Sequence, residues 1–321
     1  MTKRYVGIDL GGTNLKLGLV TGDGRIVERL SRPTEATRGP DFVMGQMVEA
    51  VRDLAKIAGV PLAEIAGIGV GAPGPLDTKA GVVIFAPNMP GWTQVPVVET
   101  LKRALSRPVR LENDANMAAY GEFRCGAGST VRDMIMLTLG TGVGGGIVID
   151  GRLFRGSRDV AGELGHIVIE KGGRRCGCRN HGCLEAYASA TAVVGRFSEA
   201  LSAGEASDLE KEEDFSCKDI FEAAGRGDRL AARIVAETAD YLATGIASLL
   251  HVLNPAMVVL TGGMMNAGDE FLDRVLASVR AQAIGRAIDK CEIRWSTLGG
   301  DAGILGSALA AEAFDRTGQP A

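Results

Sequence analysis

The stretch YVGIDLGGTNLKLGLVTGDGRIVER, residues 5–29, carries the strongest indication of the fold. It contains three β-type runs, separated first by the glycine-rich reversal Gly11-Gly12-Thr13 and then by the dipeptide Asp23-Gly24. Asp-Gly between apolar runs is a typical hairpin turn, because both residues accept positive φ. The stretch therefore predicts three consecutive strands joined by tight turns.

The same order of elements recurs about half a chain later in MIMLTLGTGVGGGIVIDGRLF, residues 134–154. Its reversal is Gly140-Thr141-Gly142, and its hairpin turn is Asp150-Gly151. Two copies of one pattern at this spacing favour a duplicated unit and two similar lobes. The alternative is chance similarity, because glycine-rich hairpins are common.

Helices and further strands follow each copy. Residues 41–59 place apolar side chains at three- and four-residue steps, which predicts an amphipathic helix that ends at Gly59. Residues 65–77 predict a buried strand that enters a Gly/Pro loop, and residues 229–254 predict a long helix with an apolar face. The order is mixed α/β, and we expect a last helix from about Gly303 to pack on the first lobe.

The chain has 321 residues, 46% of them hydrophobic, which is enough for two compact domains. Its net charge of −4, without a cluster of Lys and Arg, argues against a nucleic-acid partner. No apolar run reaches membrane-spanning length, and the first residues lack a signal segment. We therefore expect a cytoplasmic protein without a membrane partner, in which clustered cysteines are metal ligands rather than disulfides.

Each glycine-rich turn follows a β-run, where backbone N–H groups can converge on a phosphate. Thr13 and Thr141 add hydroxyl donors, and the TGG of residues 261–263 forms a third such turn. Asp9, at the end of the first β-run, can hold Mg²⁺ through water. The dinucleotide fingerprint needs a helix after its glycines, whereas a β-run follows here, and no GxxxxGK[ST] loop occurs. Plain hairpins are the alternative, but three such turns favour nucleotide binding.

The stretch HIVIEKGGRRCGCRNHGC, residues 166–183, gathers metal-binding side chains. Three thiolates and one imidazole would complete a closed tetrahedral zinc site, which is structural because no position stays open for water. The imidazole is His166 or His181, and His181 lies inside a short loop where ring closure is tight. Free thiols or a redox switch are the alternatives. The candidate thiolates are Cys176, Cys178 and Cys183.

By ordering the loop, zinc would also affect the residues on either side of it. Ordering a glycine-rich loop costs roughly 1–2 kcal/mol per residue, and zinc coordination can offset much of that cost. Glu163 and Glu185 flank the candidate ligands on either side. We therefore expect zinc to fix these two carboxylates in place.

Seven segments, in one order along the chain, resemble the ROK family of sugar kinases, and within it the bacterial glucokinase type. They are GIDLGGTNLKLGLV, GAPGPLD, PNMPGW, ENDANMAAYGE, GTGVGGG, AGELGH and CGC....GCLE, and the resemblance extends from Asp9 to about Gly306. It implies the α/β fold of actin and the hexokinases, a duplicated ribonuclease-H-like fold of two lobes that binds ATP. We expect a small lobe of residues 1–114, joined by the C-terminal helix at about 303–316, and a large lobe of residues 115–302 with the zinc loop.

The resemblance also implies the roles of individual side chains. Asp114 matches the family's general base, which takes the proton of a sugar hydroxyl during phosphoryl transfer; from the residues alone, a helix N-cap is the simpler explanation. The implied sugar-binding residues are Asn88, Asn113, Asp114, Glu163, His166 and Glu185. The implied residues for ATP and Mg²⁺ are Asp9, Gly11, Gly12, Thr13, Asn14, Lys16, Gly140, Thr141, Gly142, Gly262 and Gly263. The implied zinc ligands are His166, Cys176, Cys178 and Cys183.

These matches imply an ATP-dependent hexose kinase that phosphorylates the sugar 6-hydroxyl, with glucose as the first candidate substrate. N-acetylmannosamine, N-acetylglucosamine and fructose are alternative sugars, and polyphosphate is an alternative donor. A sugar-sensing protein is the alternative from another class, but the family's repressors carry a DNA-binding domain where this sequence has only eight residues before Asp9. The resemblance suggests a homodimer or a tetramer of dimers.

One residue departs from the family pattern. The family usually has glycine directly after the second cysteine of the zinc loop, whereas this chain has Arg179. If that position requires positive φ, we expect the loop to bend differently here.

Overall fold

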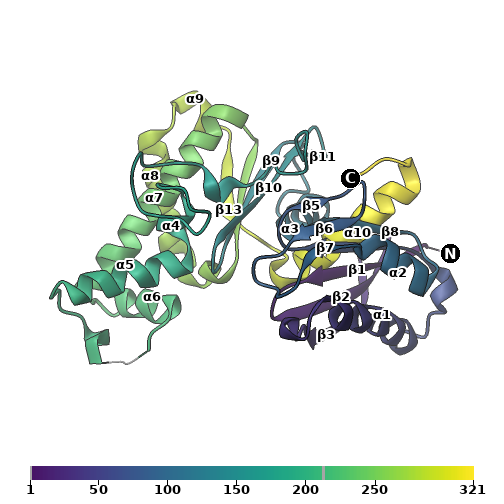
Figure 1. Ribbon diagram of the computed structural model, residues 1–321. Helices are drawn as coiled ribbons and strands as arrows, with labels where there is room; N and C mark the ends of the chain where they lie inside the picture. The colour runs from purple at the N-terminus through teal and green to yellow at the C-terminus, as the bar shows by residue number, and fades with distance from the viewer. Residues whose placement is uncertain (1, 212–213) are drawn as a thin grey trace. The chain divides into compact units, whose positions relative to one another are not determined.

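A computed structural model describes residues 2–211 and 214–321, which form β-sheets flanked by α-helices (Figure 1). The chain divides into two compact units, each assembled from separate segments. The first unit comprises Met1–Arg132, Gly146–Gly162 and Thr297–Ala321. The second comprises Asp133–Gly145 and Glu163–Ser296.

The first unit is built on a five-stranded sheet with the order β3-β2-β1-β4-β8. The first three strands are antiparallel, whereas β1, β4 and β8 run parallel. The hairpins predicted from residues 5–29 are confirmed, and Gly24 has the positive φ, 89°, expected in its turn. The strands are β1 (Arg4–Leu10), β2 (Asn14–Thr21), β3 (Ile26–Pro33), β4 (Ile65–Ala72) and β8 (Val109–Asn113).

A second five-stranded sheet repeats this arrangement, with the order β11-β10-β9-β12-β13. Here β12 pairs in parallel with β9 and β13, and β10 pairs with β11 in antiparallel fashion. Asp150 and Gly151 both have positive φ, 52° and 76°, as the predicted turn requires. The shared strand order confirms the predicted duplication. The strands are β9 (Met134–Leu139), β10 (Val143–Ile149), β11 (Arg152–Leu153), β12 (Met257–Thr261) and β13 (Glu292–Trp295).

Helices accompany both sheets, and the first unit also holds a small sheet of β5 (Leu76–Asp77), β6 (Val82–Phe85) and β7 (Thr93–Val95). The helices of the first unit are α1 (Pro40–Ile57), α2 (Val97–Leu105), α3 (Asp114–Cys125) and α10 (Ala302–Thr317). Those of the second unit are α4 (Glu185–Ala188), α5 (Ala190–Ser202), α6 (Cys217–Gly225), α7 (Arg229–Leu253), α8 (Gly268–Gln282) and α9 (Gly285–Ile288). α1 and α7 match the two helices predicted above.

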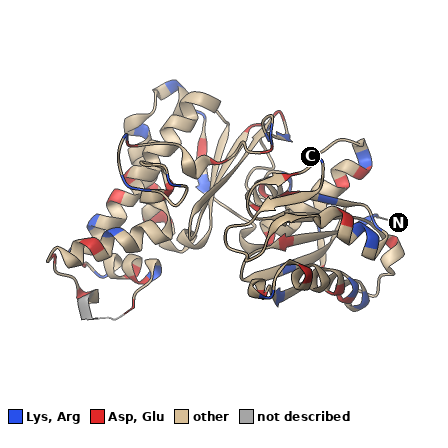
Figure 2. Ribbon diagram, viewed as in Figure 1, with Lys and Arg blue, Asp and Glu red and all other residues tan. Residues whose placement is uncertain are grey.

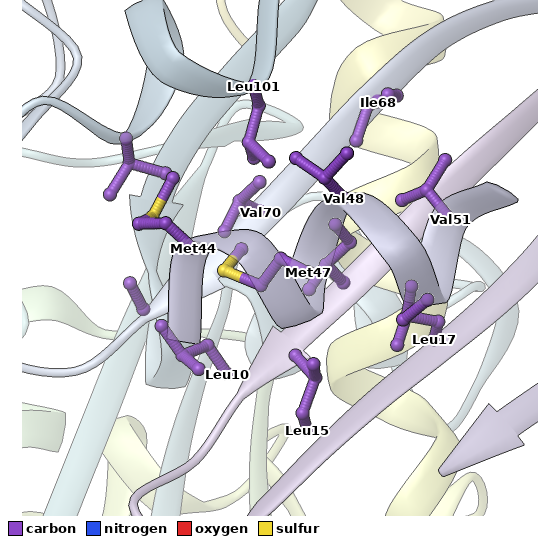
Figure 3. Packing of buried hydrophobic residues seen from close by; sticks show 14 of the residues in the cluster. Leu10, Leu15, Leu17, Met44, Met47, Val48, Val51, Ile68, Val70 and Leu101 are labelled. Carbon is purple, nitrogen blue, oxygen red and sulfur yellow. The ribbon is translucent and has the colours of Figure 1, made fainter. Parts of the chain in front are cut away.

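Alternate residues of β1 serve the two faces of the first sheet. Val6, Ile8 and Leu10 are buried in the aliphatic core that α1 covers, and Figure 3 shows α1 side chains over this core. Tyr5 lies on the opposite face and packs against residues of α10. Asp9 shares that second face, so its carboxylate emerges on the α10 side of the sheet.

The α10 helix lies unusually close to the sheet. A Cβ atom at Gly69 of β4 would lie 1.8 Å from the carbonyl oxygen of Ser307, and one at Gly7 of β1 would lie 1.9 Å from that of Ile304. Only glycine permits such an approach. α3 in turn packs along α10. The predicted large lobe of residues 115–302 therefore differs from the second unit, because residues 115–132, 146–162 and 297–302 belong to the first unit.

Charged residues are distributed over both units. Figure 2 shows acidic and basic residues interspersed along the helices of each unit. Within residues 2–211 and 214–321, no helix combines the length and the apolar character needed to cross a lipid bilayer.

Candidate functional site

Two predicted carboxylates lie at one edge of the first sheet. The parallel strands β1, β4 and β8 end level with one another, since Asp9 is paired with Gly71 and Ala72 with Asn113. Asp9 is the penultimate residue of β1, and Asp114 directly follows β8. The carboxyl ends of parallel strands are where ligands bind in open α/β sheets. The structure thus brings Asp9 and Asp114 to the same edge of the sheet.

The environment of Asp9 is electrostatically unusual. Burial raises the pKa of Asp9 to about 6, while the Lys16 ammonium lowers this pKa and the Asp114 carboxylate raises it. A Cβ atom at Gly303, near the start of α10, would lie 2.9 Å from the Asp9 carboxyl carbon. The start of α10 therefore closes over Asp9. This contact was not predictable from local patterns, because the two residues are far apart in the chain.

The start of α3 separates the roles of Asn113 and Asp114. Asn113 is the helix N-cap, because its Oδ1 accepts hydrogen bonds from the backbone N–H of Ala115 (2.9 Å) and Asn116 (3.1 Å). The alternative explanation of Asp114 as the N-cap is therefore wrong. Asp114 is half-buried, and its Oδ1 accepts a hydrogen bond from the Ala115 N–H at 2.8 Å. Since its Oδ1 is occupied, Asn113 has its Nδ2 amide to offer a hydroxyl group.

Hydrogen bonds from Thr34 hold the first glycine-rich turn in place. Gly11 N–H donates to the carbonyl of Asn14 at 3.0 Å, which closes the turn. The buried Thr34 donates its hydroxyl to the Gly11 carbonyl at 2.6 Å and its N–H to the Thr13 carbonyl at 2.8 Å. A Cβ atom at Gly12 would meet the backbone of Asn88 at 3.5 Å, so two predicted site residues lie against one another. Thr34 was not predicted, because it belongs to no recognised motif.

The second glycine-rich turn and the turn after β12 lie at one edge of the second sheet. Thr138 of β9 and Thr261 of β12 are register partners, so both turns begin at the same level. Gly262 has a φ of 100°, and a Cβ atom there would lie 2.3 Å from the Leu139 carbonyl oxygen. Gly262 is therefore required both for its conformation and for its close approach to β9. In contrast, a Cβ atom at Gly140 would meet nothing within 4 Å.

Helix α5 anchors this second turn. Thr191 donates its hydroxyl to the Thr141 carbonyl at 2.8 Å, and Ala190 N–H donates to the Gly140 carbonyl at 2.8 Å. Gly140 N–H in turn donates to the Gly142 carbonyl at 3.0 Å. The turn is therefore fixed before any ligand binds, as a backbone cradle for phosphate requires.

The predicted metal ligands come together in the second unit. One donor atom from each of His166, Cys176, Cys178 and Cys183 lies within 4.8 Å of the other three. The His166 Nδ1 is 3.7 Å from Cys176 Sγ, and Cys178 Sγ is 3.7 Å from Cys183 Sγ. Tetrahedral ligands at a Zn–S distance of ~2.3 Å lie ~3.8 Å apart, so the four groups fit zinc. His181, the competing imidazole, is exposed and outside this cluster.

Burial and the local backbone act differently on these thiols. Burial raises the pKa of Cys176 to about 12 and also raises the pKa of Cys183. A backbone N–H at Asn180 lowers the pKa of Cys178. Because thiolates are the metal-binding form, a cation that binds here must displace these protons.

The flanking glutamates touch the metal-ligand cluster. Glu185 Oε1 lies 3.4 Å from Cys176 Sγ, and its Oε2 accepts from Val143 N–H at 3.0 Å, just after the second glycine-rich turn. Glu163 Oε2 lies 3.9 Å from the Nε2 of His166, on the ring edge opposite the thiols. Glu185 thus connects the cysteine loop to the glycine-rich turn within one unit.

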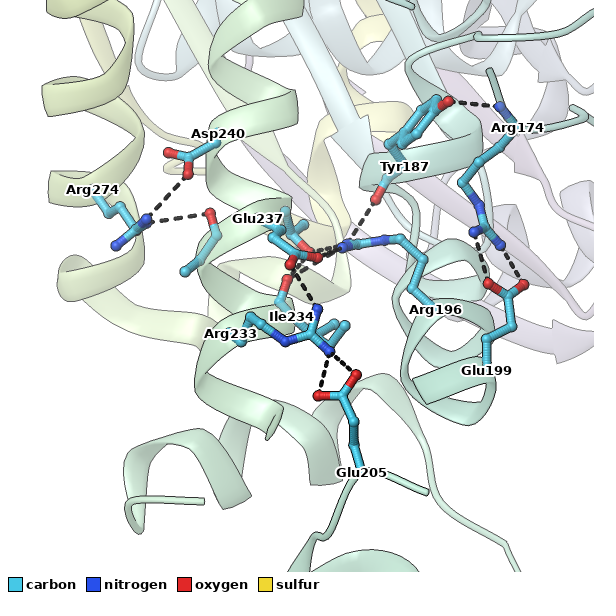
Figure 4. Close-up of polar contacts among 12 residues, drawn as sticks. Arg174, Tyr187, Arg196, Glu199, Glu205, Arg233, Ile234, Glu237, Asp240 and Arg274 are labelled. Carbon is cyan, nitrogen blue, oxygen red and sulfur yellow. Dashed lines mark hydrogen bonds and ion pairs between the residues drawn. The ribbon is translucent and has the colours of Figure 1, made fainter. Parts of the chain in front are cut away.

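A buried arginine holds the short helix that begins with Glu185. The Arg196 side chain on α5 is only 6% exposed, and Figure 4 shows it bridging α4 and α7. Its Nη1 donates to Glu237 at 3.0 Å, and its Nη2 donates to the Tyr187 carbonyl at 3.0 Å. Arg196 was not predicted, because a single arginine inside an amphipathic helix is an ordinary surface pattern.

Arg179 adopts the conformation that glycine would favour. Its φ is 75°, and its N–H closes a turn on the Cys176 carbonyl at 2.9 Å. We expected a different bend if this position required positive φ, but the arginine itself adopts positive φ here. The arginine instead accepts a left-handed backbone, at a cost of about 1–2 kcal/mol.

The predicted site residues thus form two groups, one in each unit. The first unit brings together Asp9, Gly11, Gly12, Thr13, Asn14, Lys16, Asn88, Asn113 and Asp114. The second unit holds Gly140, Thr141, Gly142, Glu163, His166, Cys176, Cys178, Cys183, Glu185, Gly262 and Gly263. Each group contains a glycine-rich turn at a sheet edge and at least one carboxylate, which suits phosphate and hydroxyl chemistry.

Comparison with known proteins identifies the relatives of this chain. A family model described as the ROK family matches residues 5–313. The glucokinase of Halalkalibacterium halodurans is 38% identical, over 94% of this chain and 93% of that protein. A ROK hexokinase from Thermus thermophilus is 36% identical with a TM-score of 0.84, over 98% of this chain and 99% of that one. A ROK family glucokinase from Streptomyces griseus, solved with glucose and AMPPNP, is 34% identical with a TM-score of 0.81, over 97% and 99%.

Proposed function

This chain belongs to the ROK family, and on that premise we propose that it is an ATP-dependent hexose kinase of the glucokinase type. It transfers the γ-phosphoryl group of ATP to the 6-hydroxyl of a hexose, with glucose as the first candidate. Relatives named as glucokinases over nearly the whole chain support the sugar, and the neighbour solved with AMPPNP supports the nucleotide.

One observation carries the chemistry, namely the two carboxylates at one sheet edge. Asp114 lies close enough to Asp9 for its charge to raise the pKa of Asp9. Phosphoryl transfer to an alcohol needs a carboxylate that accepts the hydroxyl proton and another that helps to place the metal–phosphate group. The pair at this edge supplies both.

Asp114 acts as the general base in this proposal. It takes the proton of the 6-hydroxyl as the new phosphorus–oxygen bond forms, while the bond to the leaving ADP breaks. Asn113 keeps the neighbouring backbone rigid through its cap and offers its amide to the sugar. The contributions of Asn88, Glu163, His166 and Glu185 to sugar binding remain predictions.

Backbone N–H groups of the glycine-rich turns bind phosphate oxygens. The turn at Gly11-Gly12-Thr13 is fixed by Thr34, and the turn at Gly140-Thr141-Gly142 is fixed by α5, which supports this role. Mg²⁺, when bound, neutralises phosphate charge, and Asp9 would hold it. The roles of Asn14, Lys16, Gly262 and Gly263 toward ATP remain predictions.

The cysteine cluster would hold a structural zinc ion. His166, Cys176, Cys178 and Cys183 supply four ligands and leave no open position, so the ion would stabilise the loop rather than react. The contact from Glu185 to Cys176 supports the prediction that an ordered loop would fix this carboxylate.

The variant Asp114→Asn tests the proposal. It removes the proton acceptor but keeps the side-chain shape, so we expect kcat to fall about 10²–10⁴-fold while glucose still binds. A coupled ADP-release assay measures kcat, and calorimetry measures glucose binding. Asp41→Asn, at an exposed position in α1, is the matched control and should keep full activity. A kcat for Asp114→Asn within a few-fold of wild type would remove Asp114 from this role.

A substrate panel tests the sugar and the donor. Glucose, fructose, N-acetylmannosamine and N-acetylglucosamine should each be assayed with ATP, and glucose should also be assayed with polyphosphate. We expect the highest kcat/KM for glucose with ATP. A higher value for an amino sugar would reassign the substrate without changing the reaction.

A further inference from the structure

A largely buried ion pair lies directly beside the proposed base. Glu112, two residues before Asp114, is only 5% exposed. Its Oε2 accepts a hydrogen bond from the Nε of Arg155, a residue in the segment that follows β11. Both partners belong to the first unit. Since an unpaired buried charge is unfavourable, each side chain depends on the other.

The second oxygen of Glu112 holds the turn that carries Asp114. Its Oε1 accepts from the backbone N–H of Asn113 at 3.0 Å and from the Nδ2 of Asn116 at 3.0 Å. Asn116 is itself buried, at 3% exposed. Glu112 therefore binds the turn on both sides of Asp114 through hydrogen bonds.

The segment that supplies Arg155 is fixed at further points. Asp159 accepts hydrogen bonds from Thr78, through the backbone N–H at 3.1 Å and the hydroxyl at 2.8 Å. The Nη1 of Arg155 also donates to the backbone oxygen of Ala321 at 2.7 Å. The guanidinium is thus held in place, as a group that orients another must be.

We propose that Arg155 is a positioning residue for the general base: by pairing with Glu112 it holds the turn of Asp114 and cancels the negative charge beside it. This inference rests on the proposed kinase function. Asp9 on β1 is a further negative charge that interacts with Asp114, and Lys16 on β2 acts on Asp9 with the opposite sign. The positive charge of Arg155 neutralises the negative charge of Glu112.

The pH dependence of kcat separates this role from a purely structural one. In Arg155→Met the carboxylate of Glu112 loses its counter-charge, and its negative field then favours the protonated form of Asp114. We expect the acidic limb of the kcat–pH profile to move up by about one pH unit. We also expect kcat at neutral pH to fall about 10–100-fold because the turn loosens. Arg158→Met, an exposed position in the same segment, should leave both unchanged.

Two further variants complete the test. The double variant Glu112→Gln/Arg155→Met has no unpaired buried charge, so its acidic limb should return to the wild-type position while kcat stays lowered. Arg155→Lys keeps the positive charge but lacks the planar guanidinium group. Its kcat–pH profile should therefore keep the acidic limb at the wild-type position. If Arg155→Met fails to fold, the double variant still tests the proposal. A wild-type kcat in the double variant would overturn it.

The outcomes distinguish this inference from the function on which it rests. A kcat–pH profile of Arg155→Met that superimposes on wild type overturns the positioning role, whatever its melting temperature. The kinase assignment then stands if Asp114→Asn is still inactive. An active Asp114→Asn enzyme would instead contradict the assignment of the base itself.

Discussion

At the scale of single residues, Asp9 shows how function opposes stability. Burial raises its pKa to about 6 from an ordinary value near 3.8, so the folded chain binds this proton more tightly than the unfolded chain does. The stabilisation from that proton is complete below about pH 4 and is lost as the pH rises through about 6. At neutral pH the fold must therefore carry a buried charge, which the proposed metal–phosphate ligand would compensate.

The variant Asp9→Asn tests this linkage. Because asparagine carries no charge to bury, we expect the variant to exceed wild type in free energy of unfolding by about 1–3 kcal/mol at pH 7.5. The difference should shrink as the pH falls through 6 toward 4. Urea unfolding of both proteins at several pH values, without nucleotide, measures it. A difference that does not change with pH would contradict the assigned burial of the charge, and kcat should fall in either case.

At the scale of elements, the closeness of α10 to the first sheet determines the surroundings of Asp9. Gly69 of β4 meets the Ser307 carbonyl at a distance that leaves no room for a methyl group. We expect Gly69→Ala to push α10 away from the sheet, lower the free energy of unfolding by about 3 kcal/mol and reduce kcat as the contact of Gly303 with Asp9 opens.

A matched control for this substitution lies in α1. A Cβ atom at Gly45 would meet nothing within 4 Å, and the residue is exposed within the helix. Gly45→Ala should therefore stabilise the protein, by about 0.5–1 kcal/mol. Urea unfolding compares the two variants. Equal effects would show that the fit of α10 against β4 does not limit stability.

Element-scale features were also those that the sequence predicted best. The hairpins were predictable because Asp23-Gly24 and Asp150-Gly151 specify their turns locally, and the metal cluster because its ligands lie within one short loop. The proximity of Asp9 and Asp114 required the strand order β1-β4-β8, which no local pattern encodes. Arg155 and Glu112 are 43 residues apart and share no motif, so their pairing was not predictable.

At the scale of the whole molecule, the two sheets share one strand order, but the two units carry different functional residues. The first unit carries the carboxylates at the ends of β1 and β8. The second unit carries the cysteine cluster, which lies between β11 and α4 in the chain. Bound zinc should therefore stabilise the second unit specifically.

The two tryptophans of the chain make this testable, because each unit contains one. Trp92 lies in the first unit and Trp295 in the second. In Trp92→Phe, fluorescence reports the second unit; in Trp295→Phe, it reports the first. After zinc removal by a chelator, we expect the unfolding midpoint reported by Trp295 fluorescence to drop by roughly 5–10 °C, which corresponds to a loss of about 3 kcal/mol in the free energy of unfolding. The midpoint reported by Trp92 fluorescence should not change. Adding zinc back should restore the midpoint. Equal drops in both variants, with metal loss verified by elemental analysis, would show instead that the metal stabilises the chain as one cooperative body.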